Sequence, residues 1–158
     1  MKHHFVLGLT MSLTLASGGA SAIDGKSYPP AMCTPTLGGP LYDWNYGVGQ
    51  TALTNVSGQA RQIICPIVRD FEATTFGLNW AAAWVNNPSG QTTTCTLYSV
   101  DVNGGSLDWS TKSTSGTGNQ ALYFGSEVNV SNIWSHYSLA CTLPSGGALR
   151  SYTIYEET

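Results

Sequence analysis

The chain has 158 residues and few charges: six Lys and Arg and nine Asp and Glu give a formal net charge of −3. The basic residues are scattered, whereas nucleic acids and anionic lipids are bound by concentrated positive charge, so both classes of partner are excluded. This length allows one domain with a sizeable buried core. Five Trp and eight Tyr supply enough apolar area to argue against a disordered chain.

Residues 1–22 are predicted to be a secretory signal peptide. Lys2 supplies a positive start, the run Phe5–Leu15 is apolar, and Ala20-Ser21-Ala22 matches the small-x-small pattern that a signal peptidase cleaves. The apolar run is too short to cross a bilayer, and no later segment is long and apolar enough to do so. The mature protein is therefore expected to be secreted or periplasmic, without membrane insertion.

The next segment, residues 23–40, is rich in Pro and Gly and is expected to be an irregular arm. Residues 41–158 are expected to form the folded domain. This part breaks into short segments rich in β-branched and aromatic residues, separated by Gly, Asn, Pro and Ser. The predicted strands, in chain order, are Leu41–Val48, Ala60–Val68, Thr75–Val85, Thr92–Val102, Ser106–Thr114, Gln120–Gly125, Ser135–Leu143 and Leu149–Glu156.

Two of these strands are joined by a hairpin turn. Asn103-Gly104 readily adopts the positive φ angles of a tight turn, so Thr92–Val102 and Ser106–Thr114 should pair antiparallel. No segment has the periodicity and caps of a helix. About eight short strands separated by turn residues predict an all-β sandwich or barrel, with antiparallel sheets that keep one face in water.

Four cysteines follow the predicted signal peptide, at Cys33, Cys65, Cys95 and Cys141. An even number in an exported chain predicts two disulfides, whereas zinc sites use closely spaced pairs that this sequence lacks. Four cysteines allow three pairings. Cys95 and Cys141 both lie on the apolar face of their predicted strands, which favours Cys95–Cys141 and leaves Cys33–Cys65. Inward-facing disulfides fit an antiparallel two-sheet β-sandwich better than a closed barrel.

Short blocks around the cysteines resemble a group of known proteins. The blocks are Cys65-Pro66-Ile67-Val68-Arg69-Asp70, Cys95-Thr96-Leu97-Tyr98-Ser99, Tyr137–Pro144 and Ser151-Tyr152-Thr153-Ile154. Together they resemble small, exported bacterial proteins with four cysteines and no assigned activity. The resemblance implies an exported β-sandwich, and it carries over no catalytic residue.

Catalytic chemistry has few candidate residues. His136 is the one histidine after the predicted signal peptide, and because the Gly-x-Ser-x-Gly pattern is absent, it is interpreted as structural. Glycoside hydrolysis needs two carboxylates at a suitable separation, and Asp70 and Glu72 would share one face of a continuing strand. A polar loop is the favoured interpretation of that segment. Other carboxylates considered are Asp43, Asp101, Asp108 and Glu127.

One turn has some features of a calcium loop. Asp101, Asn103 and Asp108 place three oxygen-bearing side chains close together in the sequence. The third acid and the terminal Glu of a complete calcium loop are absent, and a hairpin turn explains Asn103-Gly104 without a metal. A plain turn is therefore favoured over a calcium site, and no cofactor is expected.

Trp80 and Trp84 are the best candidates for ligand contacts. Alternation places Trp80, Ala82 and Trp84 on one face of their predicted strand, with about 13 Å between the two indoles. Large aromatic side chains in a sandwich are commonly buried, so a core position is the favoured interpretation. If this face is instead in water, it offers a flat apolar strip that stacks on sugar rings, which would be extended by Trp44, Tyr46, Trp109 and Trp134.

The sequence thus predicts an exported, disulfide-stapled β-sandwich without enzymatic activity, in a binding or structural role. The expected partner is a polysaccharide, contacted through Trp80 and Trp84, or an envelope protein. Two alternatives stay open. One is a small glycan hydrolase that uses a carboxylate pair, and the other is a subunit or inhibitor that binds a protein through an exposed sheet edge. Coverage of that edge by residues 23–40 would argue against the second alternative.

Overall fold

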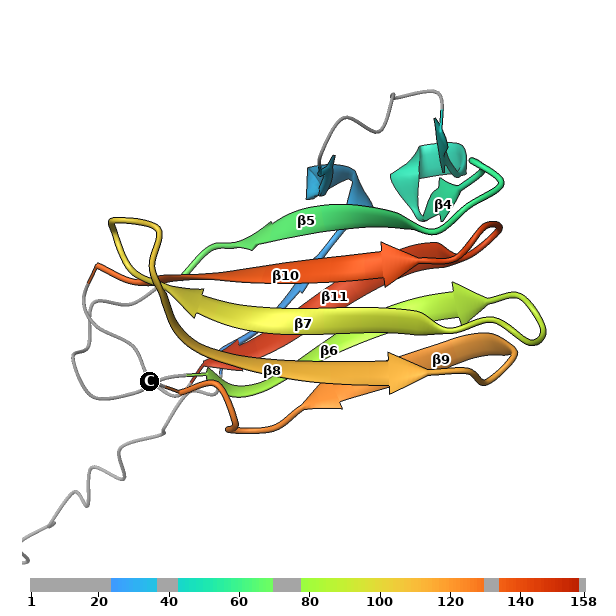
Figure 1. Ribbon diagram of the computed structural model, residues 1–158. Helices are drawn as coiled ribbons and strands as arrows, with labels where there is room; N and C mark the ends of the chain where they lie inside the picture. The colour runs from blue at the N-terminus through green and yellow to red at the C-terminus, as the bar shows by residue number, and fades with distance from the viewer. Residues whose placement is uncertain (1–23, 37–42, 70–77, 130–133, 157–158) are drawn as a thin grey trace, which may run out of the picture.

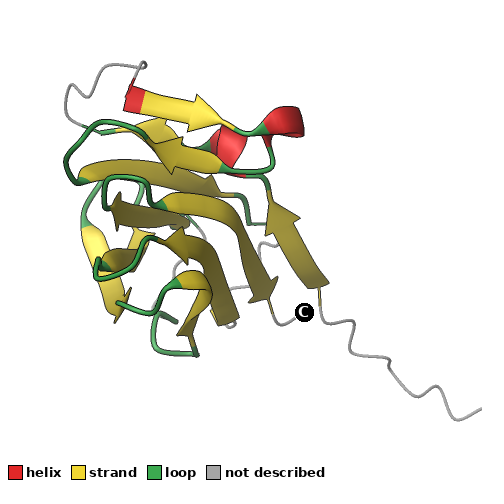
Figure 2. Cartoon of the chain, turned by 90° about the vertical axis from the view of Figure 1, so that its right-hand side faces the viewer, coloured by secondary structure: helices red, strands yellow, loops and turns green. Residues whose placement is uncertain are grey.

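The computed structural model describes residues 24–36, 43–69, 78–129 and 134–156 (Figure 1). Two antiparallel sheets pack face to face, which confirms the predicted all-β sandwich. Helix in this part of the chain is limited to short 3-10 turns such as η1 (Pro30–Met32) and η3 (Val48–Gln50), red in Figure 2. Within the described ranges, none of these turns has the length and apolar character that a membrane span requires.

The larger sheet has six strands. Five follow one another across the sheet in the order β3 (Trp44–Tyr46), β4 (Leu53–Asn55), β11 (Ala148–Glu156), β6 (Leu78–Asn87) and β9 (Gly118–Phe124). The sixth, β1 (Asp24–Tyr28), pairs with β11 along the edge that β6 does not occupy. All of these pairings are antiparallel, so neighbouring strands present aligned rows of side chains on each face.

The second sheet has five strands in the order β2 (Thr34–Pro35), β5 (Arg61–Ile67), β10 (His136–Leu143), β7 (Thr93–Val100) and β8 (Ser106–Thr114). The predicted hairpin joins β7 to β8, with Thr93 opposite Thr114 and Val100 opposite Ser106. Gly104 in its turn has φ +82°, a conformation that glycine adopts without strain. The turn chemistry that predicted this hairpin is therefore confirmed.

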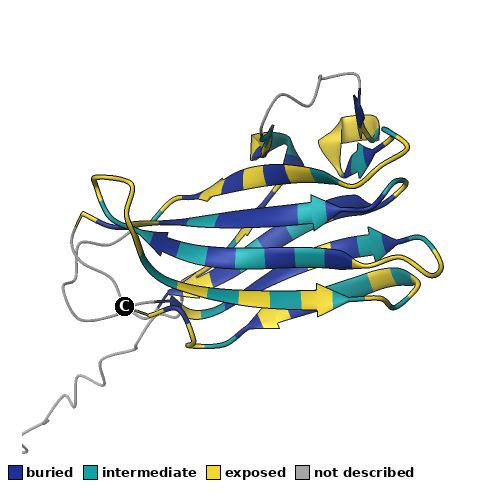
Figure 3. Ribbon diagram, viewed as in Figure 1, coloured by how far each residue is buried: buried dark blue, intermediate teal, exposed yellow. Residues whose placement is uncertain are grey.

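The core lies between the two sheets, and its residues follow the alternation of the strands. In β7 every second residue is buried and the others are half-buried, as the bands of Figure 3 show. Strand β10, in the middle of the same sheet, is buried more extensively, with three consecutive buried residues at Leu139–Cys141. The largest fully buried aromatic side chains are Tyr137, Tyr152 and Phe124. These three large side chains occupy much of the space between the sheets.

The segment expected to be an irregular arm, residues 23–40, instead adds β1 and β2 to the two sheets. Tyr28 at the end of β1 is buried and stacks on Tyr152 of β11, with ring centroids 5.0 Å apart. Lys26 Nζ lies 3.2 Å from a carboxylate oxygen of Glu156. Pro29 and Pro30 follow β1 directly, and Pro35 lies in the edge strand β2, so prolines are tolerated at these positions. Composition alone therefore missed a strand held by non-local contacts.

Other strand predictions agree with the structure to within a few residues. β8 has the predicted bounds, and β5, β7, β9, β10 and β11 differ from theirs by one or two residues at an end. The short strand β4 was not predicted. The prediction Leu41–Val48 is shorter in the structure, where β3 is followed by η3. Residues 41–42 and 75–77 of the predicted strands lie outside the described residues.

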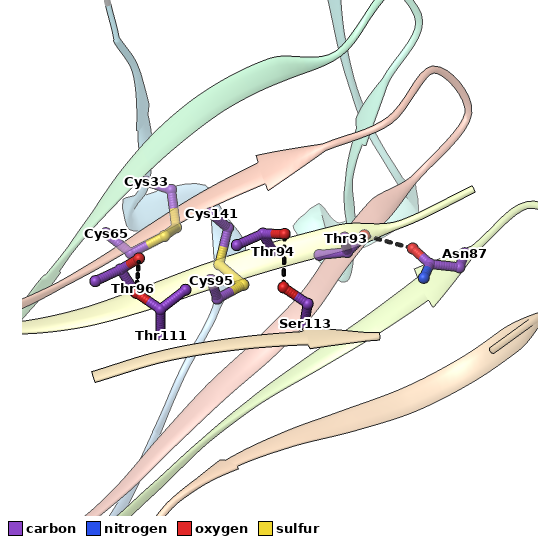
Figure 4. The surroundings of a disulfide bond; sticks show 10 residues. All are labelled: Cys33, Cys65, Asn87, Thr93, Thr94, Cys95, Thr96, Thr111, Ser113 and Cys141. Atoms are coloured by element: carbon purple, nitrogen blue, oxygen red, sulfur yellow. Dashed lines mark hydrogen bonds between the residues drawn. A yellow bond between two sulfur atoms is a disulfide. The ribbon is translucent and has the colours of Figure 1, made fainter. Parts of the chain in front are cut away.

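Both predicted disulfides are present: Cys33 is bonded to Cys65, and Cys95 to Cys141 (Figure 4). Cys95 and Cys141 lie directly opposite each other on β7 and β10, and both are fully buried. Side-chain alternation therefore predicted the pairing correctly. Two disulfides are typical of proteins in oxidising compartments outside the cytosol.

Candidate functional site

The outer face of the six-stranded sheet carries the two candidate tryptophans of β6. Ala81, Ala83 and Val85 point into the core, and the alternating positions face outward. Trp84 is 39% exposed and Trp80 is half-buried. The interpretation of these tryptophans as core residues is therefore wrong. The core positions of β6 are instead taken by Leu78 and the small residues Ala81, Ala83 and Val85.

Two tyrosines from neighbouring strands complete an aromatic cluster on this face. Tyr155 of β11 contacts Trp80 edge-on, with ring centroids 4.7 Å apart. Tyr123 of β9 contacts both tryptophans, at 5.8 Å from Trp80 and 6.1 Å from Trp84. The four rings thus form a continuous chain across three strands, which we call the aromatic face. Exposed aromatic clusters of this kind are uncommon on protein surfaces unless they bind something.

The strand register explains why these four rings meet. Tyr155 lies opposite Trp80 in the β11–β6 pair, and Tyr123 lies opposite Ala82 in the β6–β9 pair. Ala82 is only 2% exposed although it faces outward. Its methyl group leaves space for the Tyr123 ring to lie between the two tryptophans and cover it. The alternation of Leu122-Tyr123-Phe124 and Ile154-Tyr155-Glu156 could have indicated both tyrosines from the sequence, but only the register brings them to Trp80 and Trp84.

Strand β1 supports the outer end of the aromatic face. Gly25 lies opposite Tyr155, and a Cβ atom at Gly25 would come within 2.6 Å of the Tyr155 ring. The ring therefore lies over the backbone of β1, in a space that only glycine leaves open. A strand that the sequence analysis expected to be irregular thus helps to position one of the four rings.

Polar side chains without charge flank the aromatic face, and the exposed Arg150 lies in the bulge of β11 next to the residue opposite Trp84. Ser27 and Thr153 share a hydrogen bond of 3.0 Å between their hydroxyl groups. Asn86, one outward position beyond Trp84 on β6, donates to the Asn119 side-chain oxygen at 2.8 Å. Apolar rings flanked by hydroxyl and amide groups can contact a ligand through both dispersion and hydrogen bonds. Ser27, Thr153, Asn86 and Asn119 themselves carry no charge.

The rings of the aromatic face do not lie in one plane. The Trp80–Tyr155 and Trp84–Tyr123 contacts are T-shaped, with interplanar angles of 71° and 78°, and the Trp80–Tyr123 planes meet at 41°. The flat strip expected from Trp80 and Trp84 is therefore replaced by a corrugated surface. Edge-to-face packing of this type is the favoured arrangement of aromatic rings, because their edges and faces carry opposite partial charges.

Trp44 and Trp109, which the sequence analysis added as possible ligand contacts, lie elsewhere. Trp44 on β3 is 6% exposed and belongs to the core. Trp109 is 62% exposed, but it lies on β8 opposite Tyr98, on the outer face of the other sheet. Position in the sequence could not reveal that these tryptophans separate, because it does not show which strands share a sheet.

The candidate hydrolase pair, Asp70 and Glu72, lies outside the described residues. Carboxylates with described side chains all have protein partners. Asp43 lies 2.8 Å from Arg61, and Glu127 lies 2.6 Å from Lys112. Glu156 lies near Lys26 and Arg69 in a mostly buried cluster. The remaining two are hydrogen-bonded to backbone amides: Asp101 and Asp108.

The turn that resembled part of a calcium loop is organised by backbone hydrogen bonds. Asp101 Oδ1 accepts from the amides of Asn103 and Gly105, each at 2.8 Å. Asp108 accepts from the amide of Trp109. The bond from the Asn103 amide to Asp101 is that of an Asx turn, which accounts for Asp101 at this position. Within the described residues, no group of three His, Cys, Asp or Glu side chains is placed to hold a metal ion.

His136 is exposed at the first position of β10. It lies opposite Val100 of β7 in the strand register. Since Val100 offers neither an acid nor a nucleophile, this pairing adds nothing to a catalytic interpretation of His136.

Comparison with known proteins gives resemblances in strand arrangement. No protein-family model matches the sequence, and no curated protein matches it. An exo-β-1,3-galactanase from Phanerochaete chrysosporium, solved with galactose, is similar with a TM-score of 0.47 and 17% identity, over 84% of this chain and 29% of that one. A β-(1,4)-mannanase from Podospora anserina has a TM-score of 0.46 and 13% identity, over 85% and 28%. A xylan-binding module has a TM-score of 0.46 and 12% identity, over 85% and 96%.

Proposed function

We propose that this protein is an exported, non-enzymatic β-sandwich that binds a neutral carbohydrate through the aromatic face. The single observation that carries the proposal is the chain of four rings, Tyr155, Trp80, Tyr123 and Trp84, on the outer side of the six-stranded sheet. A folded protein gains stability by burying such rings, so their exposure favours a role in binding.

The chemistry of the surroundings favours a sugar as the ligand. A pyranose has one apolar face of C–H groups and a rim of hydroxyls. Aromatic rings can stack on the first, while the hydroxyl and amide groups of Ser27, Thr153, Asn86 and Asn119 can bond the second. These four side chains carry no charge, which favours a neutral ligand, and the guanidinium of Arg150 at the edge of the face can donate to sugar hydroxyls. Binding of this kind needs no metal and no catalytic group.

Substitution of Trp84 tests this proposal, with Trp109 as the matched control. Both are exposed tryptophans on strands, but they lie on opposite outer faces of the sandwich. In affinity electrophoresis through gels containing xylan, galactan, galactomannan or β-glucan, we expect at least one polysaccharide to retard the wild-type protein. Trp84→Ala should weaken this interaction about tenfold or more, as for loss of one aromatic hot spot, and Trp109→Ala should leave it unchanged.

Three results would contradict the proposal. The first is that the wild-type protein migrates unretarded through every gel. The second is that Trp84→Ala is retarded as strongly as the wild type. The third is self-association: if sedimentation shows a wild-type dimer that Trp84→Ala converts to a monomer, the aromatic face is an interface between copies of the chain. Circular dichroism of both variants checks that the fold is kept.

A further inference from the structure

The shape of the aromatic face indicates how much of a carbohydrate it contacts, provided that the proposed function holds. The four rings extend from β11 across β6 to β9, and Trp80 and Trp84 are separated by about 13 Å of strand. A single pyranose is no larger than one indole. One sugar unit therefore cannot contact all four rings, and several consecutive units can.

The aromatic face lies on the outside of a sheet. Beyond Trp84 the surface continues with the Asn86–Asn119 amide pair, and beside Thr153 it continues with the hydroxyl of Ser27. These flanking groups are uncharged, and the exposed Arg150 lies in the β11 bulge beside Trp84. An open surface that is lined mainly by uncharged groups fits the interior of a long polysaccharide chain better than its end.

Tyr123 joins the two tryptophans into one surface. The side chain of Tyr123 is 52% exposed, whereas Trp84 is 39% exposed and Tyr155 is 36% exposed. Tyr123 lies opposite Ala82, whose outward side chain is buried, so a larger side chain at position 82 would crowd the rings around it. Without Tyr123, no ring would connect Trp80 with Trp84.

We infer that the aromatic face binds an internal stretch of a soluble, neutral polysaccharide, several sugar units at a time, and that Tyr123 is a binding residue positioned by Ala82. The steep angles between the rings, 41° to 78°, prevent them from forming one plane. A crystalline polysaccharide surface, which is flat, therefore contacts only part of the aromatic face, whereas a single flexible chain can follow it.

Calorimetric titration with cello-, xylo-, manno-, galacto- and laminari-oligosaccharides, from the monosaccharide to the hexasaccharide, tests this inference. In the oligosaccharide series that binds, we expect no measurable binding of the monosaccharide. The affinity should then rise with each sugar unit that is added over the first few units. Tyr123→Ala should weaken hexasaccharide binding about tenfold. Ala82→Leu should do the same by displacing Tyr123, and Ala82→Ser should bind like the wild type.

The outcomes separate this inference from the proposed function. If the monosaccharide binds as tightly as the hexasaccharide, or if Tyr123→Ala binds normally, the inference fails while the effect of Trp84→Ala still stands. Tighter binding to microcrystalline cellulose or chitin than to any soluble chain in a pull-down would also overturn it. If the wild type binds no probe, both fail. Should Ala82→Leu not fold, Tyr123→Ala decides, because its side chain lies on the outer face.

Discussion

The hydroxyl group of Tyr152 connects the two sheets through a hydrogen bond. It donates a hydrogen bond of 2.7 Å from β11 to the carbonyl oxygen of Pro66 on β5. Its ring stacks on Tyr28, whose own hydroxyl donates to the carbonyl of Val68 at 2.9 Å. Burial, and secondarily the neighbouring Tyr28, raises the pKa of Tyr152 well above its usual range. The fold therefore holds Tyr152 as a neutral phenol.

Tyr152→Phe should lower the free energy of unfolding by about 1 kcal/mol, because the Pro66 carbonyl loses its donor in a partly buried site. The raised pKa adds a pH dependence with a definite sign. Below about pH 10, the ordinary pKa of tyrosine, Tyr152 is protonated in both states and its contribution is complete. As the pH rises further, the unfolded state loses its proton first, so stability falls.

Urea unfolding of wild type and Tyr152→Phe between neutral and alkaline pH measures both effects. The variant should be less stable at neutral pH and should lose less stability at alkaline pH. Tyr155→Phe is the matched control, since it removes a hydroxyl from the outer face of the same strand and should change stability by less than about 0.5 kcal/mol. If wild type and Tyr152→Phe have the same free energy of unfolding and lose it equally as the pH rises, the hydrogen bond from Tyr152 to Pro66 does not stabilise the fold.

At the scale of elements, β8 is an edge strand with polar residues on both faces. Its outward side forms a ladder with β7, in which Thr96 bonds Thr111 and Thr94 bonds Ser113 (Figure 4). On its inward side, Lys112 lies opposite the buried Cys95 and its Nζ lies 2.6 Å from Glu127. A charge pointing inward from an edge discourages pairing with the edge of another molecule.

Lys112→Met tests this role of the edge. The hydrogen bonds from Lys112 and then Ser110 lower the pKa of Glu127, so the pKa measured by NMR should rise towards its ordinary value in the variant. A lowered carboxylate pKa adds stability above the ordinary pKa of about 4.5 that is lost as the pH falls through the folded-state pKa. Wild type should therefore exceed Lys112→Met in stability at neutral pH, and the difference should shrink in acid.

The same variant should also associate more readily, because a neutral side chain at the inner side of β8 removes the protection of the edge. Light scattering at increasing concentration measures this. Thr111→Val, on the outward side of the same strand, is the control and keeps the inward charge. An unchanged Glu127 pKa together with unchanged association would show that Lys112 has no such role.

For the whole molecule, the two disulfides connect segments that are far apart in the sequence. They are separated by 32 and 46 residues, and each is buried. In the unfolded chain, each crosslink removes loop-closure entropy worth about 4 kcal/mol. Strands β7 and β10 are already paired over seven residues around Cys95 and Cys141, so the fold does not depend on this bond for its register.

The double substitution of Cys95 and Cys141 by Ala should give a folded protein with a free energy of unfolding lower by about 2–5 kcal/mol. Urea unfolding without reductant measures the loss. The corresponding Cys33 and Cys65 double variant is the control for loop length, and its loss should be similar. Loss of less than about 1 kcal/mol from both variants would contradict the entropic argument.

Mass spectrometry of exported, non-reduced protein should show no alkylated thiol and an N-terminus at Ile23.

Local sequence patterns predicted the long strands because a strand with one face in the core must alternate along its length. The same pattern predicted the disulfides, since Cys95 and Cys141 could meet only if both faced inward. The three-residue strand β4 has no such pattern. It is held by contacts from far along the chain, including the hydrogen bond from the Asn55 side chain to the Leu143 carbonyl at 2.9 Å. Contacts of that kind leave no periodic signal.

By itself, the sequence determined the all-β class and the turn between β7 and β8, because alternation and turn residues restrict local conformation, and it favoured one of the three possible cysteine pairings. Only the tertiary structure decided that Trp80 and Trp84 face water and that Tyr123 and Tyr155 join them. Alternation defines the two faces of β6, but it does not say which one meets the other sheet. That choice is made by tertiary packing: Tyr137, Tyr152 and Phe124 from three other strands share the core with Ala81, Ala83 and Val85, and a close-packed interior has limited room for further large side chains.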